Sequence, residues 1–159
     1  MVVAVLLPRS IVEYVRREAE KLGLSLEEYI VDVLVQGLDP RDRAVEYIEA
    51  AKELLEEARE ELKKGNIRQA AEKIWGTATL AAKAYAWWRE NKRLTSHREL
   101  WEYSKKVADE LGEWVSHAWN EANAMHICFY EGWCLREHVE AALRQIERLV
   151  REIEAKVKG

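Results

Sequence analysis

The segment from Ile74 to Trp88 reads IWGTATLAAKAYAWW, and Lys83 is its only charged residue. A helix that is apolar on every side must be surrounded by other elements of the protein. The segment is shorter than the roughly 20 residues that a membrane-spanning helix needs, and charged residues follow it directly. It therefore predicts a buried central helix within a protein fold, and no membrane span.

Composition narrows the class of protein. The chain has 159 residues, which suits one ordinary domain, and 34% of them are charged, with abundant Glu, Lys, Arg, Ala and Leu as in helical bundles. The net charge of -4 gives no general attraction for nucleic acid, so such binding would need a local basic patch. The first residues, MVVAVLLP, lack the basic leader and cleavage site of a signal peptide, so we expect a cytoplasmic protein.

The chain has only two cysteines, Cys128 and Cys134, so it is no disulfide scaffold. The two thiols could be free, joined in a disulfide or bound to a metal. Together with His126 and His138 they supply the ligand types of a zinc site, but their spacing differs from that of zinc knuckles, and we expect no metal. The dense charge and the few Gln, Asn and Met residues suit a thermophile.

Capping residues mark where the predicted helices begin. Ser10, Ser25 and Ser96 each stand three positions before a glutamate, and Asn66 stands three positions before a glutamine. In this arrangement the two side chains satisfy free backbone amides at a helix start. Asp39 precedes a proline, which suits the first position of a helix. The predicted helices span residues 9–22, 25–36, 40–64, 67–90, 97–111, 113–128 and 136–157.

Two helix pairings follow from local patterns. The Gly65–Asn66 step combines a left-handed helix end with a new helix start, which predicts an antiparallel hairpin of 40–64 and 67–90. The last helix repeats apolar residues in a heptad rhythm, which suits packing against a neighbouring helix or against a second copy of the chain. The residues of this repeat are Val139, Leu143, Ile146, Val150, Ile153 and Val157.

All seven tryptophans lie between Trp75 and Trp133, which predicts an aromatic core. Trp87 and Trp88 adjoin a basic stretch. Basic side chains beside an aromatic ring can bind single-stranded nucleic acid, although such a stretch is also typical of a solvated loop. The basic residues are Arg89, Lys92, Arg93 and Arg98.

Three segments carry a resemblance to a known family: AVEYIEAAKELLEEAREELKKGNIRQAAEKIWGTATLAAKAYA, SHRELWEY and AMHICFYEG. They resemble the archaeal PaREP family, which is similar to the HEPN superfamily (higher eukaryotes and prokaryotes nucleotide-binding). The resemblance covers nearly the whole chain and implies an all-α fold, an up-down four-helix bundle. We expect residues 39–159 to form this HEPN-like bundle. Residues 1–38 would add an extended arm and further helices as a candidate dimerisation element.

The same resemblance bears on catalysis. Many HEPN ribonucleases carry an arginine and a histidine with four to six residues between them. Only three residues separate Arg93 from His97, one too few, and no arginine stands at that distance before His126 or His138. We therefore predict a non-catalytic binding or protein-interaction module without a cofactor. The alternative is a metal-independent ribonuclease or a component of a toxin–antitoxin-like pair, and a nucleotidyltransferase-type protein is a candidate partner.

Several side chains are candidates for ligand contacts. Lys83 in the apolar helix either pairs with a carboxylate or lines an anion-binding cleft. His126 lies among apolar residues, so it is either a core histidine bonded to a neighbouring helix or a pocket residue. His97 stands at a helix start, as a surface residue or as a phosphate contact. The complete set of candidate ligand or phosphate contacts is Lys83, Arg89, Arg93, His97, Arg98 and His126.

The N-terminus suggests a separate idea. The VVAVLL run at residues 2–7, followed by two predicted helices, resembles a ribbon-helix-helix DNA-binding unit, which dimerises through its strand. Both faces of this strand would be apolar, however, and a face without hydrogen-bonding groups reads base pairs poorly. A dimerising or core-docking arm is the better interpretation, and we expect a homodimer.

Overall fold

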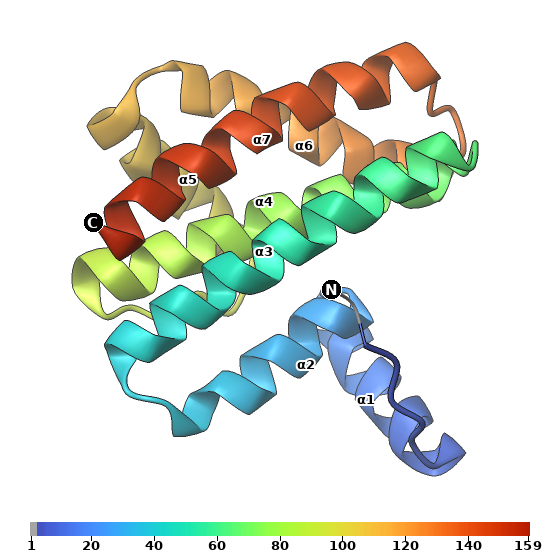
Figure 1. Cartoon of the computed structure of the whole chain (residues 1–159), viewed down its shortest axis with the longest axis horizontal. Coiled ribbons are helices and arrows are strands. Elements are labelled where there is room, and N and C mark those ends of the chain that lie inside the picture. The colour runs from blue at the N-terminus through green and yellow to red at the C-terminus, as the bar shows by residue number, and fades with distance from the viewer. Residues whose placement is uncertain (1–2) are drawn as a thin grey trace.

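The computed structural model describes residues 3–159, and within that range every regular element is helical (Figure 1). The all-α prediction is confirmed. The helices are α1 (Arg9–Lys21), α2 (Leu26–Leu34), the short 3-10 helix η1 (Val35–Gly37), α3 (Pro40–Lys63), α4 (Ile67–Glu90), α5 (His97–Leu111), α6 (Trp114–Glu131) and α7 (Arg136–Lys158).

Helix α4 is the centre of the fold. It packs against α3, α5, α6 and α7, and every residue from Ile74 to Trp87 is buried. The next residue, Trp88, is 40% exposed, so burial ends where the basic stretch begins. The prediction of a buried central helix is therefore confirmed. No helix within residues 3–159 is long and apolar enough to cross a membrane.

Helices α3 and α4 form the predicted antiparallel hairpin (Figure 1). Gly65 adopts a φ of 81°, which a residue with a side chain rarely reaches, and the Asn66 amide donates to the Glu61 carbonyl at 2.9 Å. The predicted caps at Ser25, Asp39 and Ser96 are confirmed, since each side chain accepts a hydrogen bond from the backbone amide three positions later.

Two predicted caps are wrong. Helix α1 already begins at Arg9, after Pro8, so Ser10 lies inside the first turn and caps nothing. The Asn66 side chain does not cap α4 either. Its amide group donates to Glu61 Oε2 at 2.7 Å, at the end of α3. At the first site the helix begins one position earlier than predicted, directly after Pro8. At the second site the Glu61 carboxylate binds the Asn66 side chain, which is then not available as a cap.

The apolar stripe of α7 packs within the same chain. Helix α7 contacts α3, α4 and α6, and Val139, Ile146 and Ile153 are fully buried there. Of the two partners that the heptad rhythm left open, the structure therefore uses neighbouring helices.

The aromatic core is smaller than predicted. Trp75, Trp87 and Trp119 are buried, whereas Trp101 and Trp133 are 38% and 43% exposed. A tryptophan-rich sequence indicates aromatic packing but does not say which rings face water, because several lie near helix ends. The core itself is made largely of small and aliphatic side chains from α3, α4, α6 and α7.

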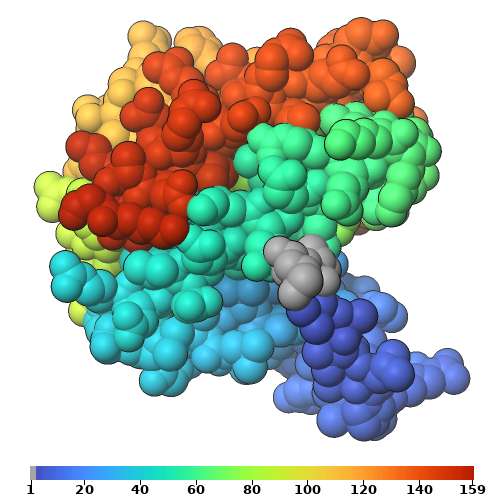
Figure 2. All heavy atoms as spheres, viewed as in Figure 1, coloured from blue at the N-terminus to red at the C-terminus, as the bar shows by residue number. Residues whose placement is uncertain are grey.

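The N-terminal part lies to one side of this bundle. Residues 3–8 belong to no helix, as the predicted arm requires, while Val2 of that arm lies outside the described residues. Helices α1 and α2 form a hairpin below α3 (Figure 1), and Figure 2 shows this hairpin (blue) standing out from the edge of the molecule.

Candidate functional site

An apolar groove of about 730 Å³ runs between the arm, α1 and α2. Its neighbouring side chains are unusually exposed for their type: Leu6 is 99% exposed, Val5 75% and Leu34 72%. We call this region the N-terminal apolar surface. It consists of Val3, Val5, Leu6, Leu7, Tyr14, Val33 and Leu34.

The orientation of α2 explains why this surface stays exposed. The buried residues of α2 are two acids, Glu28 and Asp32. They stand four positions apart, on one face of the helix, and this face is turned towards the bundle. Most apolar residues of α2 line the groove instead, whereas Val31 packs against the core. The face of α2 that docks on the bundle therefore carries two buried acids.

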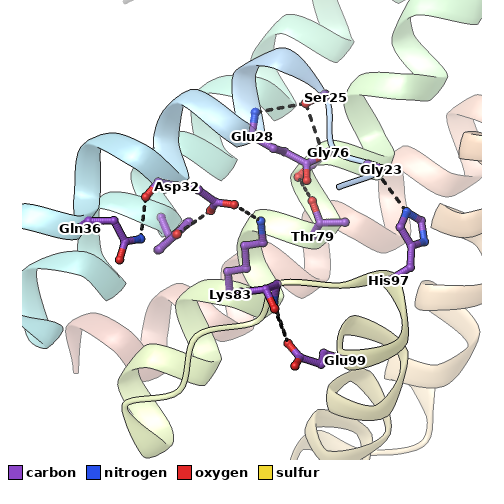
Figure 3. A network of polar contacts seen from close by, with 12 residues as sticks. Gly23, Ser25, Glu28, Asp32, Gln36, Gly76, Thr79, Lys83, His97 and Glu99 are labelled. Carbon is purple, nitrogen blue, oxygen red and sulfur yellow. Dashed lines mark hydrogen bonds and ion pairs between the residues drawn. The ribbon is translucent and has the colours of Figure 1, made fainter. Parts of the chain in front are cut away.

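Asp32 joins three helices in a buried polar network (Figure 3). Its Oδ2 atom lies 2.7 Å from the Lys83 ammonium on α4, and its Oδ1 atom accepts a 2.6 Å hydrogen bond from Tyr47 on α3. Burial, followed by the charge of Asp32, raises the pKa of the Tyr47 hydroxyl. Of the two interpretations of Lys83, the structure therefore supports the ion pair.

Glu28 lies one turn before Asp32 and has no such partner. It is 1% exposed, its Oε1 atom lies 3.4 Å from the Ser25 hydroxyl, and its Oε2 atom has no hydrogen-bond partner in the described part of the chain. Burial raises the pKa of Glu28 to about 7, and the nearby Lys83 ammonium and Thr79 hydroxyl oppose that rise only in part. This carboxyl group takes up a proton near neutral pH.

A second cluster forms around Trp75. His97 on α5 and His126 on α6 both stack on this indole, with ring centroids 5.5 Å and 5.2 Å away, and the two imidazoles lie 5.5 Å from each other. The Nδ1 atom of His126 lies 3.1 Å from a carboxylate oxygen of Glu72 on α4. Tyr130 meets the His126 ring edge-on at the surface. The structure thus brings together two predicted site residues that are distant in sequence.

The hydrogen bonds of this histidine cluster fix its chemistry. A carboxylate only accepts, so His126 donates through Nδ1 and leaves Nε2 as an acceptor in the neutral ring. His97 Nε2 lies 3.3 Å from the Gly23 carbonyl, which likewise makes Nε2 the donor (Figure 3). A Glu–His pair of this kind is also found in general bases. Across residues 3–159, however, no arginine forms a hydrogen bond with either imidazole, and no three potential ligands are placed to hold a metal ion.

Two residues of the predicted basic patch are paired with acids. Arg89 pairs with Glu110 at 3.0 Å, and Arg98 pairs with Glu102 at 2.8 Å, each on α5. Lys92 lies over the Tyr103 ring, and Arg93 is exposed in the connection between α4 and α5. Arg89 also borders a cleft of about 440 Å³, which Arg41, Trp87 and Trp88 line with it.

The two cysteines are paired. A disulfide joins Cys128 on α6 to Cys134 in the connection to α7. It fixes the end of α6 beside the histidine cluster, where the backbone carbonyls of Phe129 and Tyr130 also accept hydrogen bonds from Arg68.

Sequence reasoning missed the roles of Glu28, Asp32 and Glu72. A signal was present for the first two, because acids four positions apart on a short helix share one face, opposite the apolar residues. No comparable signal was present for Glu72, which meets His126 only through the packing of α4 on α6.

These observations define an all-helical bundle protein with a buried central helix. Its N-terminal hairpin contacts the bundle through the buried acids Glu28 and Asp32. The chain belongs to the archaeal PaREP1/PaREP8 family, and the match covers residues 46–150. That range runs from α3 to α7, so the arm, α1 and α2 lie outside it. No curated protein and no solved structure gives a significant match.

Proposed function

We propose that this protein is a non-catalytic interaction module that forms a homodimer through its N-terminal apolar surface. The observation that carries the proposal is the orientation of α2, which buries Glu28 and Asp32 and leaves Val33 and Leu34 50% and 72% exposed. Contiguous apolar patches of this kind mark interaction sites on proteins in water.

Helix α2 cannot turn its apolar face towards the bundle without losing other contacts. Turning α2 over to hide Leu34 would break the Asp32–Lys83 ion pair and the hydrogen bond from Tyr47. A buried ammonium left without its partner costs several kcal/mol. The apolar face is therefore better covered by another protein surface.

A second copy of the chain fits this surface best. The arm is extended and apolar on both sides, and no backbone hydrogen bond joins residues 3–7 to any other described residue. Such an edge pairs readily with an identical segment. In a two-fold arrangement each copy supplies both an arm and a groove, so both sets of apolar side chains become buried.

The arm is poorly suited to the alternative of reading DNA. Val3, Val5 and Leu7 line the groove, and Ala4 and Leu6 are the outward residues, so no side chain offers a donor or acceptor to a base edge. A different protein partner, such as a nucleotidyltransferase, would compete with the second copy for the same surface. It would be detected as a complex that the chain does not form alone.

The bundle supports a HEPN-like core without its nuclease chemistry. Helices α3, α4, α6 and α7 pack together as two successive antiparallel pairs, which is the arrangement proposed for that core. Metal-independent RNA cleavage would need a guanidinium beside the imidazoles to hold the scissile phosphate. Arg93 and Arg98 do not contact His97 or His126 among the described residues, so we assign the histidine cluster a structural role.

Sedimentation of two matched variants of the full chain tests the proposal. Leu34→Glu places a charge in the N-terminal apolar surface, and Ile127→Glu places the same charge at another exposed apolar residue, on α6. We expect Leu34→Glu to sediment as a monomer and Ile127→Glu to remain a dimer. Equal behaviour of the two variants would overturn the proposed interface.

A further inference from the structure

We propose that Glu28 is a proton-dependent switch between the α1–α2 hairpin and the bundle. The neutral carboxyl group holds the hairpin against α4, and the ionised group loosens it. The proposal goes beyond self-association, because Glu28 lies on the face of α2 that meets the bundle and not on the N-terminal apolar surface.

The packing around Glu28 leaves its carboxyl group almost without contact to water. The side chain lies against Gly76, where an added Cβ atom would come within 3.4 Å of Glu28 Oε1 and within 2.7 Å of Leu54. The close approach at this glycine is to Leu54 on α3, and Glu28 lies in van der Waals contact beside it. With Oε2 unpartnered in the described structure, an ionised Glu28 would be a buried charge without full hydrogen bonding.

Burial favours the neutral form of Glu28, and the surrounding charges compensate for it only in part. The Lys83 ammonium favours the ionised form, but that group already lies 2.7 Å from Asp32. Two buried carboxyl groups thus share one cation, and only one of them is compensated when ionised. The polar and titratable groups around this junction are Ser25 and Asp32 on α2, Tyr47 on α3, Glu72, Thr79 and Lys83 on α4, and His97 on α5.

The other contacts between the hairpin and the bundle indicate which end of α2 would move. At the end of α2, Arg43 donates to the carbonyls of Val35 and Gln36, which anchors η1 to α3. At the start of α2, the contacts to the bundle are Glu28 itself and the 3.3 Å contact between His97 and the Gly23 carbonyl (Figure 3). Ionisation of Glu28 would therefore loosen the Gly23 end, while η1 and the Asp32–Lys83 ion pair hold the other end of α2.

The direction of the pH effect follows from linkage. The pKa of Glu28 is about 7 when the hairpin is docked, against 4.5 for the same group in water, so docking takes up a proton. Docking is strongest below pH 4.5, weakens as the pH rises through the interval up to about 7, and changes little above it. Each pH unit inside that interval weakens docking by up to about tenfold.

Amide hydrogen exchange on the full chain tests the switch. The exchange of α2 amides in the native protein is compared with that in Glu28→Gln at the same pH, so that the intrinsic pH dependence of exchange cancels. We expect α2 to open more often in the native protein than in Glu28→Gln. The ratio should be a few-fold at pH 5 and on the order of 100-fold at pH 8, and the α4 amides should show no such ratio.

Two controls keep the outcome decisive. Glu27→Gln removes an exposed carboxylate from the neighbouring position and should leave the ratio unchanged. The same ratio should appear in the Leu34→Glu background, whether or not that protein dimerises, which separates this proposal from the proposed function. A ratio that does not change between pH 5 and pH 8 would overturn it. If Glu28→Gln does not fold, an NMR titration of the native Glu28 carboxyl decides: a midpoint near pH 7 supports the switch, and one near 4.5 rejects it.

Discussion

The Lys83 ammonium on α4 lies 2.7 Å from the Asp32 carboxylate on α2, and both side chains are buried. Asp32 also accepts a hydrogen bond from Tyr47 on α3, so one carboxylate connects three helices. This contact fixes which face of α2 meets the bundle. As a consequence, the apolar face of α2 borders an open groove, and the proposed self-association depends on that orientation.

Removal of Asp32 should destabilise the fold strongly. In Asp32→Ala the Lys83 ammonium loses its ion-pair partner and Tyr47 its acceptor, and breaking a buried pair in this way costs about 3–5 kcal/mol. The free energy of unfolding, from urea titration of the full chain, measures the loss. Arg98→Ala, which breaks an exposed pair with Glu102, should cost less than about 1 kcal/mol. Similar losses in both variants would contradict the role given to Asp32.

Stability should fall with rising pH because of Glu28. Its pKa is raised from 4.5 to about 7 in the folded chain, so folding favours the neutral acid. The stabilisation is complete below pH 4.5 and is lost as the pH approaches 7, a change of about 3 kcal/mol. Urea unfolding of the native chain and of Glu28→Gln over this range isolates the effect. A constant difference between the two proteins would show that Glu28 does not titrate in this way.

Loss of the Cys128–Cys134 disulfide should have a moderate effect. The bond closes a short loop at a sequence separation of 6, and the chain-entropy estimate for a loop of this size is about 2 kcal/mol. Thermal unfolding of the native chain and of Cys128→Ser with Cys134→Ser measures it. Addition of a reductant should lower the midpoint of the native chain only. An unchanged midpoint in both proteins would mean that the bond adds no stability.

The histidine cluster should not cleave RNA. Both imidazoles are engaged by protein acceptors, His126 by Glu72 and His97 by the Gly23 carbonyl. Incubation of the purified chain with single-stranded RNA should give no cleavage above that of His126→Ala. Cleavage that disappears in His97→Ala, with an unchanged circular dichroism spectrum, would favour the ribonuclease alternative instead.

The parts of the fold that the sequence predicted are those set by local patterns. The burial of α4 follows from a run without charges around Lys83, and the caps at Ser25 and Ser96 follow from residues three positions apart. The cap predicted at Asn66 is wrong because Glu61 competes for the same side chain. The spacing of capping residues describes a single helix end. It does not include hydrogen bonds to side chains of the preceding helix, such as Glu61.

The contacts in the candidate sites depend on tertiary packing, and local sequence patterns do not predict most of them. Asp32 and Lys83 are 51 residues apart, and Glu72 and His126 are 54 residues apart, so their pairing requires the helix arrangement to be known first. The basic residues near Trp88 were grouped by sequence, yet Arg89 and Arg98 pair with different acids of α5. A charge run in a connection says little about the direction of each side chain.

Native mass spectrometry of the purified full chain tests the central claim most directly. If the N-terminal apolar surface is a self-association interface, the native chain should appear as a dimer at micromolar concentration, and Leu34→Glu should appear as a monomer of the same fold. A native chain that remains monomeric over this concentration range, with Leu6 and Leu34 open to water, would contradict the proposal.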